Sequence, residues 1–480
     1  MKKTFGVIII MCLLIFFTIV GLKVIYRSAS VFQPLQVKYN SVDSISLKTE
    51  KNNQPTNFNF QLPSTTLNKS LLLLQKERTS KGGVIGTAGK GVVALRFDDY
   101  QNVFGERIFP LLVARGLPCS MVLISQFNTQ QSWGKGTTWG EVRNWNRHGV
   151  EIWSHGTDHK DYSLKGDAGL YSQIVTSKIE IEAQNMKVVG WALPGVTPKT
   201  KNLPYNGLTK PSDYNSAVGK LLMETYALTE AYAYSPPRTL PTQIYHGLNH
   251  ITVSDGRGTL AASIKAINIA SRDKSGIELM CHAGNLGTPG RMSFSDFTIL
   301  LDYIKEQWDK GSIEVLTPSG LLFADPSSVN RLKLTTDGSF ENLTVVSSGA
   351  WKETTNWTGK TIETSGGRTG SSFLRINGKG SGVTQKIISL DKLGVTGEQF
   401  LFEGWIRPQG IRKATGIIEV VDYNDSKKLK IINKVVGEGT SWKKVSFVFC
   451  IPPNTKTIAL RLYGSSGTVM DWDDVSIKKI

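Results

Sequence analysis

The sequence predicts a parallel α/β fold over residues 90–325, followed by an all-β sandwich over residues 335–480. In the first region, short apolar runs typical of buried strands alternate with patterns typical of helices. Acidic and imidazole side chains directly follow several of these runs, which is where a β/α barrel keeps its chemistry. Past residue 331 the helical patterns stop, and short β-rich runs between turns predict the sandwich.

The first 89 residues contain an apolar segment and then a polar linker. Residues 5–22 carry no charge, and as a helix they would extend about 27 Å, marginally enough to span a bilayer. We therefore predict a membrane anchor or signal segment over residues 1–27, with an uncleaved anchor favoured. Residues 28–89, rich in Ser, Asn and Lys, predict a linker or stalk. The protein would lie at the extracytoplasmic face of the cell membrane, or be secreted if the segment is cleaved.

Strand 92–97 opens the barrel, because five of its six residues are apolar. A helix over 138–148 is predicted by the capping box of Thr138 and Glu141 and by Gly149 beyond its end. The other predicted strands are 119–124, 150–153, 187–191, 277–281 and 313–316, and the other predicted helices are 104–115, 215–225 and 295–309.

A linker over residues 326–334 separates the barrel from the sandwich. Carboxylates gather at the two ends of the sandwich sequence, and hard oxygen ligands of this kind suit a structural calcium ion, although plain turn carboxylates are the alternative. The candidate calcium ligands are Asp337, Glu341, Asp473 and Asp474. The predicted sandwich strands are 343–347, 373–376, 383–389, 400–407, 416–421, 444–450, 457–463 and 474–478.

The chain is strongly basic, with 56 Lys and Arg against 39 Asp and Glu, and a net charge of +17. This charge favours attraction to anionic polymers such as those of a cell wall. No nucleic-acid-binding motif is evident, so nucleic acid is not expected as a partner. The four cysteines form no disulfide framework, which for an exported chain favours a bacterial origin.

Two polar pairs carry the predicted chemistry. Asp98 and Asp99 close the strand at 92–97, and adjacent like charges call for a cation or for shifted pKa values. His155 and His159, four residues apart, can reach one metal ion from the same side of a turn. Two imidazoles and one carboxylate form a hydrolytic metal set, for which zinc is the default and other divalent transition metals are alternatives.

Three motifs make the pattern specific: Phe97-Asp98-Asp99-Tyr100, the run from His155 to His159, and Met280-Cys281-His282. Together they resemble the polysaccharide deacetylase family, also called NodB-like or carbohydrate esterase 4. The resemblance implies a NodB-type distorted barrel acting on an acetylated polysaccharide. It also implies Asp99, His155 and His159 as metal ligands, Asp98 as general base, His282 as general acid, and Tyr100 and Pro194 as substrate-binding residues, with the Tyr100 N–H stabilising the oxyanion.

The sequence departs from the family at two supporting motifs. The family's R-x-P is here Ala192-Leu193-Pro194, so the arginine that pairs with the base is missing. Without that cation we expect Asp98 to be more basic and less firmly oriented. Arg96 and Arg238 are candidate substitutes, with Arg96 expected to face away from the site. The acidic partner of the acid histidine has no clear match, and the candidates are Asp255 and Asp273.

Three functions are consistent with these residues. The first is removal of N-acetyl groups from a cell-surface or wall polysaccharide. The second is an O-acetyl esterase on a polysaccharide such as xylan. The third is a non-catalytic glycan-binding protein on a degenerate scaffold, which the missing arginine supports. In all three functions the sandwich would bind glycan, because its two ends resemble those of jelly-roll carbohydrate-binding modules. These ends are Asp337-Gly338-Ser339-Phe340-Glu341 and Asp473-Asp474-Val475-Ser476-Ile477.

Overall fold

A computed structural model describes residues 63–129, 133–160, 166–195, 208–254, 259–342, 351–353, 360–378, 382–409, 414–464 and 468–480. Residues 58–480 form one compact unit. The predicted anchor at 1–27 and the predicted strand at 343–347 lie outside the described residues. Within the described ranges, no helix has the length and apolar character needed to cross a bilayer.

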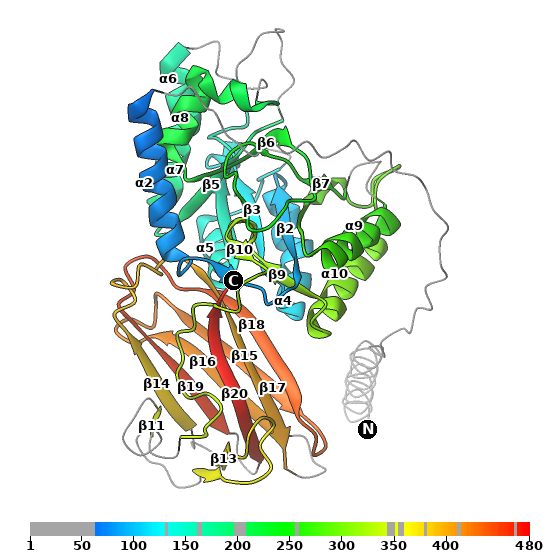
Figure 1. Cartoon of the computed structure of the whole chain (residues 1–480), viewed down its shortest axis with the longest axis vertical. Helices are drawn as coiled ribbons and strands as arrows, with labels where there is room; N and C mark the ends of the chain where they lie inside the picture. The colour runs from blue at the N-terminus through cyan, green and yellow to red at the C-terminus, as the bar shows by residue number, and fades with distance from the viewer. Residues whose placement is uncertain are drawn as a thin grey trace, which may run out of the picture. The chain divides into compact units, whose positions relative to one another are not determined.

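A parallel sheet forms the centre of the barrel region, as predicted (Figure 1). Every residue of its first strand in the sequence, β2 (Gly91–Asp98), is buried, as is typical of a parallel strand that is covered on both faces. The strand order is β6-β5-β4-β3-β2-β8-β7, with β9 also pairing with β2, and neighbours are parallel. The strands are β2 (Gly91–Asp98), β3 (Cys119–Leu123), β4 (Val150–Ser154), β5 (Val188–Ala192), β6 (Leu228–Tyr234), β7 (Ile251–Thr252), β8 (Gly276–His282) and β9 (Ile313–Leu316).

Helices flank this sheet, and Figure 1 shows α9 and α10 side by side next to it. The predicted capping box is present at the start of α5, where Thr138 Oγ1 accepts from the Glu141 N–H at 3.2 Å and Glu141 Oε2 accepts from the Thr138 N–H at 2.7 Å. The helical segments are α3 (Gln101–Val103), η1 (Phe104–Ile108), α4 (Phe109–Arg115), η2 (Phe127–Thr129), α5 (Trp139–Arg147), α6 (Gly166–Tyr171), η4 (Ser172–Thr176), α7 (Ser177–Glu182), η5 (Pro211–Asn215), α8 (Ala217–Thr225), α9 (Leu260–Asp273), η6 (Ala283–Asn285), α10 (Phe294–Asp309) and α11 (Pro318–Leu322).

One long helix lies where the sequence predicts a linker. Helix α2 (Ser64–Ser80) packs on α8, and the chain after it forms β1 (Ile85–Gly86), which pairs with β10 (Ala324–Asp325). The buried residues of α2 are polar, so the sequence has no stripe of buried apolar residues that would predict this helix. They are Thr66, Ser70, Glu77 and Ser80. The predicted stalk over 28–89 is therefore corrected: from Ser64 onward the chain is part of the folded unit.

A buried histidine holds α2 to the sheet. His246 Nε2 lies 3.2 Å from Ser70 Oγ of α2, and His246 Nδ1 lies 3.2 Å from Thr229 Oγ1 of β6. Burial lowers the pKa of His246 to about 4. An unfolded chain would bind a proton there near pH 6.5, so between these two pH values the unfolded state holds more protons. Stability is therefore expected to fall as the pH drops through this window.

The variant His246→Gln should flatten this pH dependence. Because folding lowers the pKa of His246 to about 4, the wild-type protein should lose about 2–3 kcal/mol of unfolding free energy through this residue between pH 7 and pH 4.5. Urea unfolding of wild type and variant at both values measures it. His148→Gln, at the half-buried C-cap of α5, is the control. Equal pH slopes in wild type and His246→Gln would contradict the expectation.

The C-terminal region is the predicted sandwich of two five-stranded antiparallel sheets. Trp351 and Trp472 fill its core and are fully buried. One sheet has the order β11-β14-β19-β16-β17 and the other β12-β13-β20-β15-β18. The strands are β11 (Trp351–Glu353), β12 (Lys360–Glu363), β13 (Phe373–Asn377), β14 (Gly382–Ile388), β15 (Gln399–Pro408), β16 (Ala414–Asp422), β17 (Lys430–Gly437), β18 (Lys443–Cys450), β19 (Thr457–Gly464) and β20 (Val469–Lys479).

The four carboxylates proposed to hold calcium do not gather into a metal-binding group in the described part of the chain. Asp473 Oδ2 accepts the Arg368 N–H at 2.7 Å, and Asp474 Oδ2 accepts Arg368 Nη1–H at 2.7 Å. Glu341 Oε1 accepts the Ser372 N–H at 2.8 Å. Local protein donors thus occupy oxygens of Glu341, Asp473 and Asp474, and these three residues form no metal-binding group with Asp337 in the described ranges.

The sandwich shares a core with the barrel. Leu401, Val448 and Ile480 belong to the same hydrophobic cluster as the barrel strands. A Cβ at Gly149, in the loop before β4, would lie 2.5 Å from a Val448 methyl, so the two regions touch closely there. This contact lies at the amino-terminal ends of the parallel strands, and it leaves their carboxyl ends for chemistry.

Candidate active site

The predicted site residues converge at the carboxyl ends of β4, β2 and β8, of which β2 and β8 are neighbours and β4 is separated from β2 by β3. Asp98 is the last residue of β2, His155 follows the last residue of β4, and His282 is the last residue of β8. The register of β2 and β8 sets Asp98 directly beside His282. Strand order therefore brings together residues that are far apart in the sequence.

A tight turn after β2 aims the second carboxylate. Asp99 and Tyr100 both have left-handed backbone conformations, with φ of 56° and 47°. Aspartate tolerates this region, whereas tyrosine adopts it at a cost on the order of 1 kcal/mol. The turn separates Asp99 from Asp98, and a glycine at the position of Tyr100 would adopt it without this cost.

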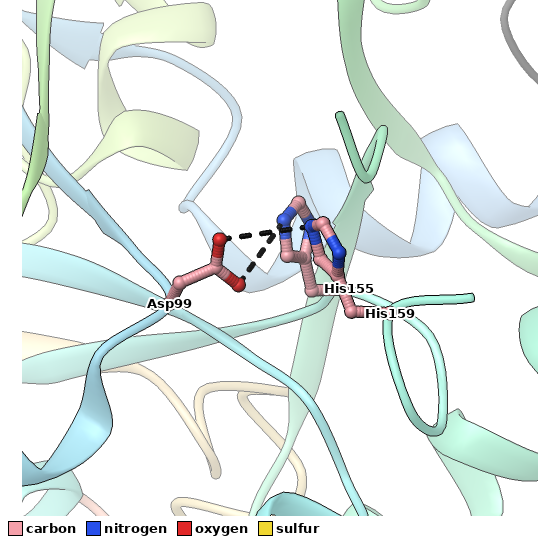
Figure 2. Close-up of side chains that lie close together, drawn as sticks. All are labelled: Asp99, His155 and His159. Carbon is pink, nitrogen blue, oxygen red and sulfur yellow. Dashed lines mark ion pairs between the residues drawn. The ribbon is translucent and has the colours of Figure 1, made fainter. Parts of the chain in front are cut away.

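Asp99, His155 and His159 form one cluster, in which the carboxylate points at the two imidazoles (Figure 2). Asp99 Oδ1 lies 3.7 Å from His155 Nε2, and Asp99 Oδ2 lies 3.6 Å from His159 Nε2. Ligands at about 2.1 Å in tetrahedral geometry are about 3.4 Å from one another. Among the described residues this is the one group of three or more His, Cys, Asp or Glu that could hold a metal ion.

The tautomer of His155 is suited to binding metal. Its Nδ1 lies 2.9 Å from the carbonyl oxygen of Ala192 at the end of β5. Because a carbonyl only accepts, Nδ1 carries the proton, and the lone pair of Nε2 faces Asp99. The segment that lacks the family's arginine thus still contributes a backbone carbonyl to the site.

Burial disfavours charge on all three residues of the cluster. Burial, together with Asp98, raises the pKa of Asp99 well above its usual range, and Asp99 Oδ1 is buried without a hydrogen-bond partner in the described chain. Burial lowers the pKa of His155 to about 3 and that of His159 to about 4. Both imidazoles are therefore neutral at pH 7. A divalent cation would pair the orphaned oxygen and use both free lone pairs, so these residues fit a metal ion.

A glutamine that the sequence did not reveal holds the histidine turn. Gln173, fully buried in η4, donates from Nε2 to Thr157 Oγ1 at 2.6 Å and to Asp158 Oδ1 at 2.8 Å. Its Oε1 accepts the Thr157 N–H at 3.0 Å. These bonds fix the segment between the two histidines. A lone glutamine within a helical pattern carries no signal that would have identified it.

Asp98 is held by an arginine of its own strand. Arg96 Nε donates to Asp98 Oδ1 at 2.7 Å and Nη2 to Oδ2 at 2.5 Å, with both residues buried. Burial alone would raise the pKa of Asp98, but Arg96 holds it well below its usual range. The expectations that Asp98 is more basic and loosely oriented, and that Arg96 faces away, are therefore wrong. Residues two apart in a strand lie on the same side of it.

The predicted acid histidine is anchored through its backbone. The His282 N–H donates to Ser254 Oγ at 2.9 Å, while its Nδ1 is buried without a hydrogen-bond partner in the described ranges. Of the two candidate partners, Asp273 is excluded, because it ends α9 at the other end of β8 and pairs with Arg272 on the surface. Asp255 lies outside the described residues.

Aromatic rings form one wall of the site. The ring of Trp133 lies 4.9 Å from that of His159 and 5.7 Å from that of Tyr100. A Cβ at Gly284, just after His282, would lie 2.1 Å from the Tyr100 ring, so only glycine lets the ring rest there. Pro194 is buried two residues past β5. The partly exposed Tyr100 and Trp133 offer faces on which a sugar ring could stack.

Comparison with known families decides the kind of domain. Residues 85–203 match the polysaccharide deacetylase family. The matched segment contains Asp98, Asp99 and both histidines of the cluster, so the resemblance drawn from these motifs is confirmed there. His282 lies beyond the matched residues. No curated protein matches the chain.

Several solved structures are similar to parts of the chain. A deacetylase solved with its substrate has 15% identity and a TM-score of 0.31, covering 49% of this chain and 93% of its own. A xylan-binding domain of Paenibacillus barcinonensis has 14% identity and a TM-score of 0.25, covering 32% and 97%. A Clostridium thermocellum xylanase structure has 15% identity and a TM-score of 0.23, and the match covers 27% of this chain and 26% of that one. Likenesses this weak carry no argument about activity.

Proposed function

We propose that this protein is a metal-dependent hydrolase that removes N-acetyl groups from an acetylated cell-surface or wall polysaccharide. The observation that carries the proposal is the convergence of Asp99, His155 and His159 beside a second, separately held carboxylate. The match of this segment to the polysaccharide deacetylase family supports the reaction class. Mixed oxygen and nitrogen ligands make zinc the default, with other divalent transition metals as alternatives.

The residues divide the chemistry between them. A divalent ion at the cluster would supply Lewis acidity, lowering the pKa of a bound water and polarising the acetyl carbonyl. Asp98 would accept the proton of the attacking water, and the Tyr100 N–H would stabilise the developing oxyanion. His282 would donate a proton to the amide nitrogen as the C–N bond breaks. Acetate and a free amine on the sugar would be the products.

Two alternatives use the same residues differently. An O-acetyl esterase would need the same cluster but would release an alcohol, so the substrate panel described below separates it from an N-deacetylase. A non-catalytic glycan binder drew its support from the missing arginine. That support is removed, because Arg96 makes a bidentate contact with Asp98.

We also propose where the protein acts. The uncharged run at 5–22 and the net charge of +17 support a protein held at the outer face of the membrane, close to an anionic wall. The sandwich would then bind the same class of polymer that the barrel deacetylates. Fractionation of cells with a protease-accessibility assay would test this location.

Acetate release from a panel of N- and O-acetylated glycans tests the proposed reaction. The variant Asp98→Asn should reduce kcat by about 10²–10⁴-fold while retaining bound zinc, because it removes the base and keeps the ligands. Asp302→Asn, a surface variant of α10 that loses only a pair with Arg115, is the control and should behave as wild type. If wild type releases no more acetate than Asp98→Asn from any glycan, the hydrolase proposal fails.

A further inference from the structure

The contact of Arg96 with Asp98 is one end of a longer buried network. Arg96 and Asp98 form two parallel hydrogen bonds, and the two residues are 2% and 3% exposed. A planar guanidinium that binds both oxygens of a carboxylate fixes its rotation as well as its charge. A single lysine could not do this, because it presents one point charge. Asp98 is thus held in one orientation, with the remaining lone pairs of its oxygens free to accept a proton.

The third guanidinium nitrogen of Arg96, Nη1, contacts residues other than Asp98. Arg96 Nη1 lies 3.3 Å from Glu278 Oε1 on β8 and 3.3 Å from His250 Nδ1, just before β7. Burial, together with the charge of Arg96, holds the pKa of His250 well below its usual range. The imidazole is therefore neutral, and its Nδ1 can accept from the guanidinium. All three nitrogens of Arg96 are thus engaged.

The network continues away from the site through Arg238 and Glu230. Arg238 Nη2 lies 3.8 Å from Glu278 Oε2 and 3.0 Å from Glu230 Oε2 on β6. The same nitrogen donates to the Asn249 carbonyl at 2.7 Å, next to His250. Arg238 therefore lies within ion-pair distance of Glu278 and binds the backbone next to His250. Each of these side chains is buried, so a displaced member would leave an unpaired charge out of water.

We propose that Arg96 is a positioning residue that replaces the missing arginine of the third motif, and that His250 and Glu278 hold it in place. The inference rests on the proposed function, in which Asp98 is the base. In the resembled family the pairing arginine stands where this chain has Ala192, on a different strand. Here the same contact comes from within β2, two residues before the base. The base and its orienting cation therefore move together with one strand.

Kinetics of arginine variants test this role. Arg96→Lys keeps the positive charge but cannot bind both oxygens of Asp98 at once, so we expect kcat to fall about 10²-fold with KM and bound zinc unchanged. In Arg96→Ala, guanidinium added at millimolar concentration should restore part of kcat in a saturable way. His250→Leu should give a smaller loss of kcat. Arg115→Lys, at a half-buried residue of α4 that pairs with the exposed Asp302, is the control.

The outcomes separate positioning from a merely structural role. Wild-type kcat in Arg96→Lys would overturn the inference. So would a loss of activity that guanidinium does not restore and that accompanies lower thermal stability and lower zinc content. A crystal structure of Arg96→Lys adds a readout that needs no activity, and we expect the Asp98 carboxylate to be rotated. An unmoved carboxylate would overturn the inference, whereas wild type inactive on every glycan would instead count against the proposed reaction.

Discussion

The variant Asp99→Asn is expected to lose both bound metal and acetate release, and yet to be more stable than the metal-free wild type. Asparagine keeps the left-handed turn, which it tolerates as aspartate does, but it brings no negative charge to the two imidazoles. Without the anionic ligand the ion should not remain after dialysis, and activity should fall to the level of Asp98→Asn or below it. Zinc analysis and acetate release measure both losses.

The gain in stability follows from the sign of the pKa shift. Burial, together with Asp98, raises the pKa of Asp99 above that of an unfolded aspartate. The metal-free folded state therefore binds a proton more tightly than the unfolded state, and stability falls as the pH rises above the unfolded value. Asparagine cannot ionise, so it should raise the unfolding free energy of the metal-free protein at pH 7 by about 1–3 kcal/mol. Asp302→Asn is the control, and a variant less stable than metal-free wild type would contradict this account.

The second large effect is expected far from the chemistry, at Glu398. This fully buried carboxylate lies 2.7 Å from Lys81 Nζ after α2 and 2.8 Å from Lys479 Nζ at the end of β20, and it also pairs with Lys187 before β5. Burial would raise the pKa of Glu398, but the three lysines hold it well below its usual range. The residue therefore joins α2, the barrel and the sandwich through one charge.

Glu398→Gln should destabilise the protein by about 3–5 kcal/mol, because it removes the carboxylate that pairs with buried Lys479 and leaves Lys81 and Lys187 to share Glu77. The stabilisation by the carboxylate is present above the unfolded pKa of about 4.3 and is lost as the pH falls below it. Chemical unfolding at pH 7 measures the loss. Glu306→Gln, which breaks an exposed pair with Lys310, should cost less than about 1 kcal/mol. A similar small loss in Glu398→Gln would show that these lysines lose their protons or reach water.

The sequence predicted those parts of the fold in which a simple periodicity reflects burial. Strand β2 was predicted because its run of apolar residues is interrupted only by Arg96, and α5 because its capping box is local. Strand β6 was missed because a buried Glu230 interrupts its pattern, and the paired Arg238 comes only after the strand ends. A buried ion pair satisfies both partners without leaving an apolar signal in the sequence.

The site shows the same division. The metal cluster could be predicted because two of its candidate ligands share one turn, and the resemblance to the deacetylase motifs identified Asp99 as the third. Arg96 was named as a candidate cation for Asp98, which the structure confirms, but the expectation that it faces away was wrong, because residues two apart in a strand lie on the same side. Gln173 and His250 could not be predicted, because each meets the site only through the packing of elements far apart in the sequence.

A crystal structure of the protein grown with zinc, with anomalous data collected across the zinc absorption edge, tests the central claim most directly. The account predicts one strong anomalous peak within about 2.0–2.2 Å of Asp99, His155 Nε2 and His159 Nε2, with Asp98 outside the coordination sphere and still bonded to Arg96. A peak elsewhere, or no peak at these three residues in crystals of protein that contains zinc, would contradict it.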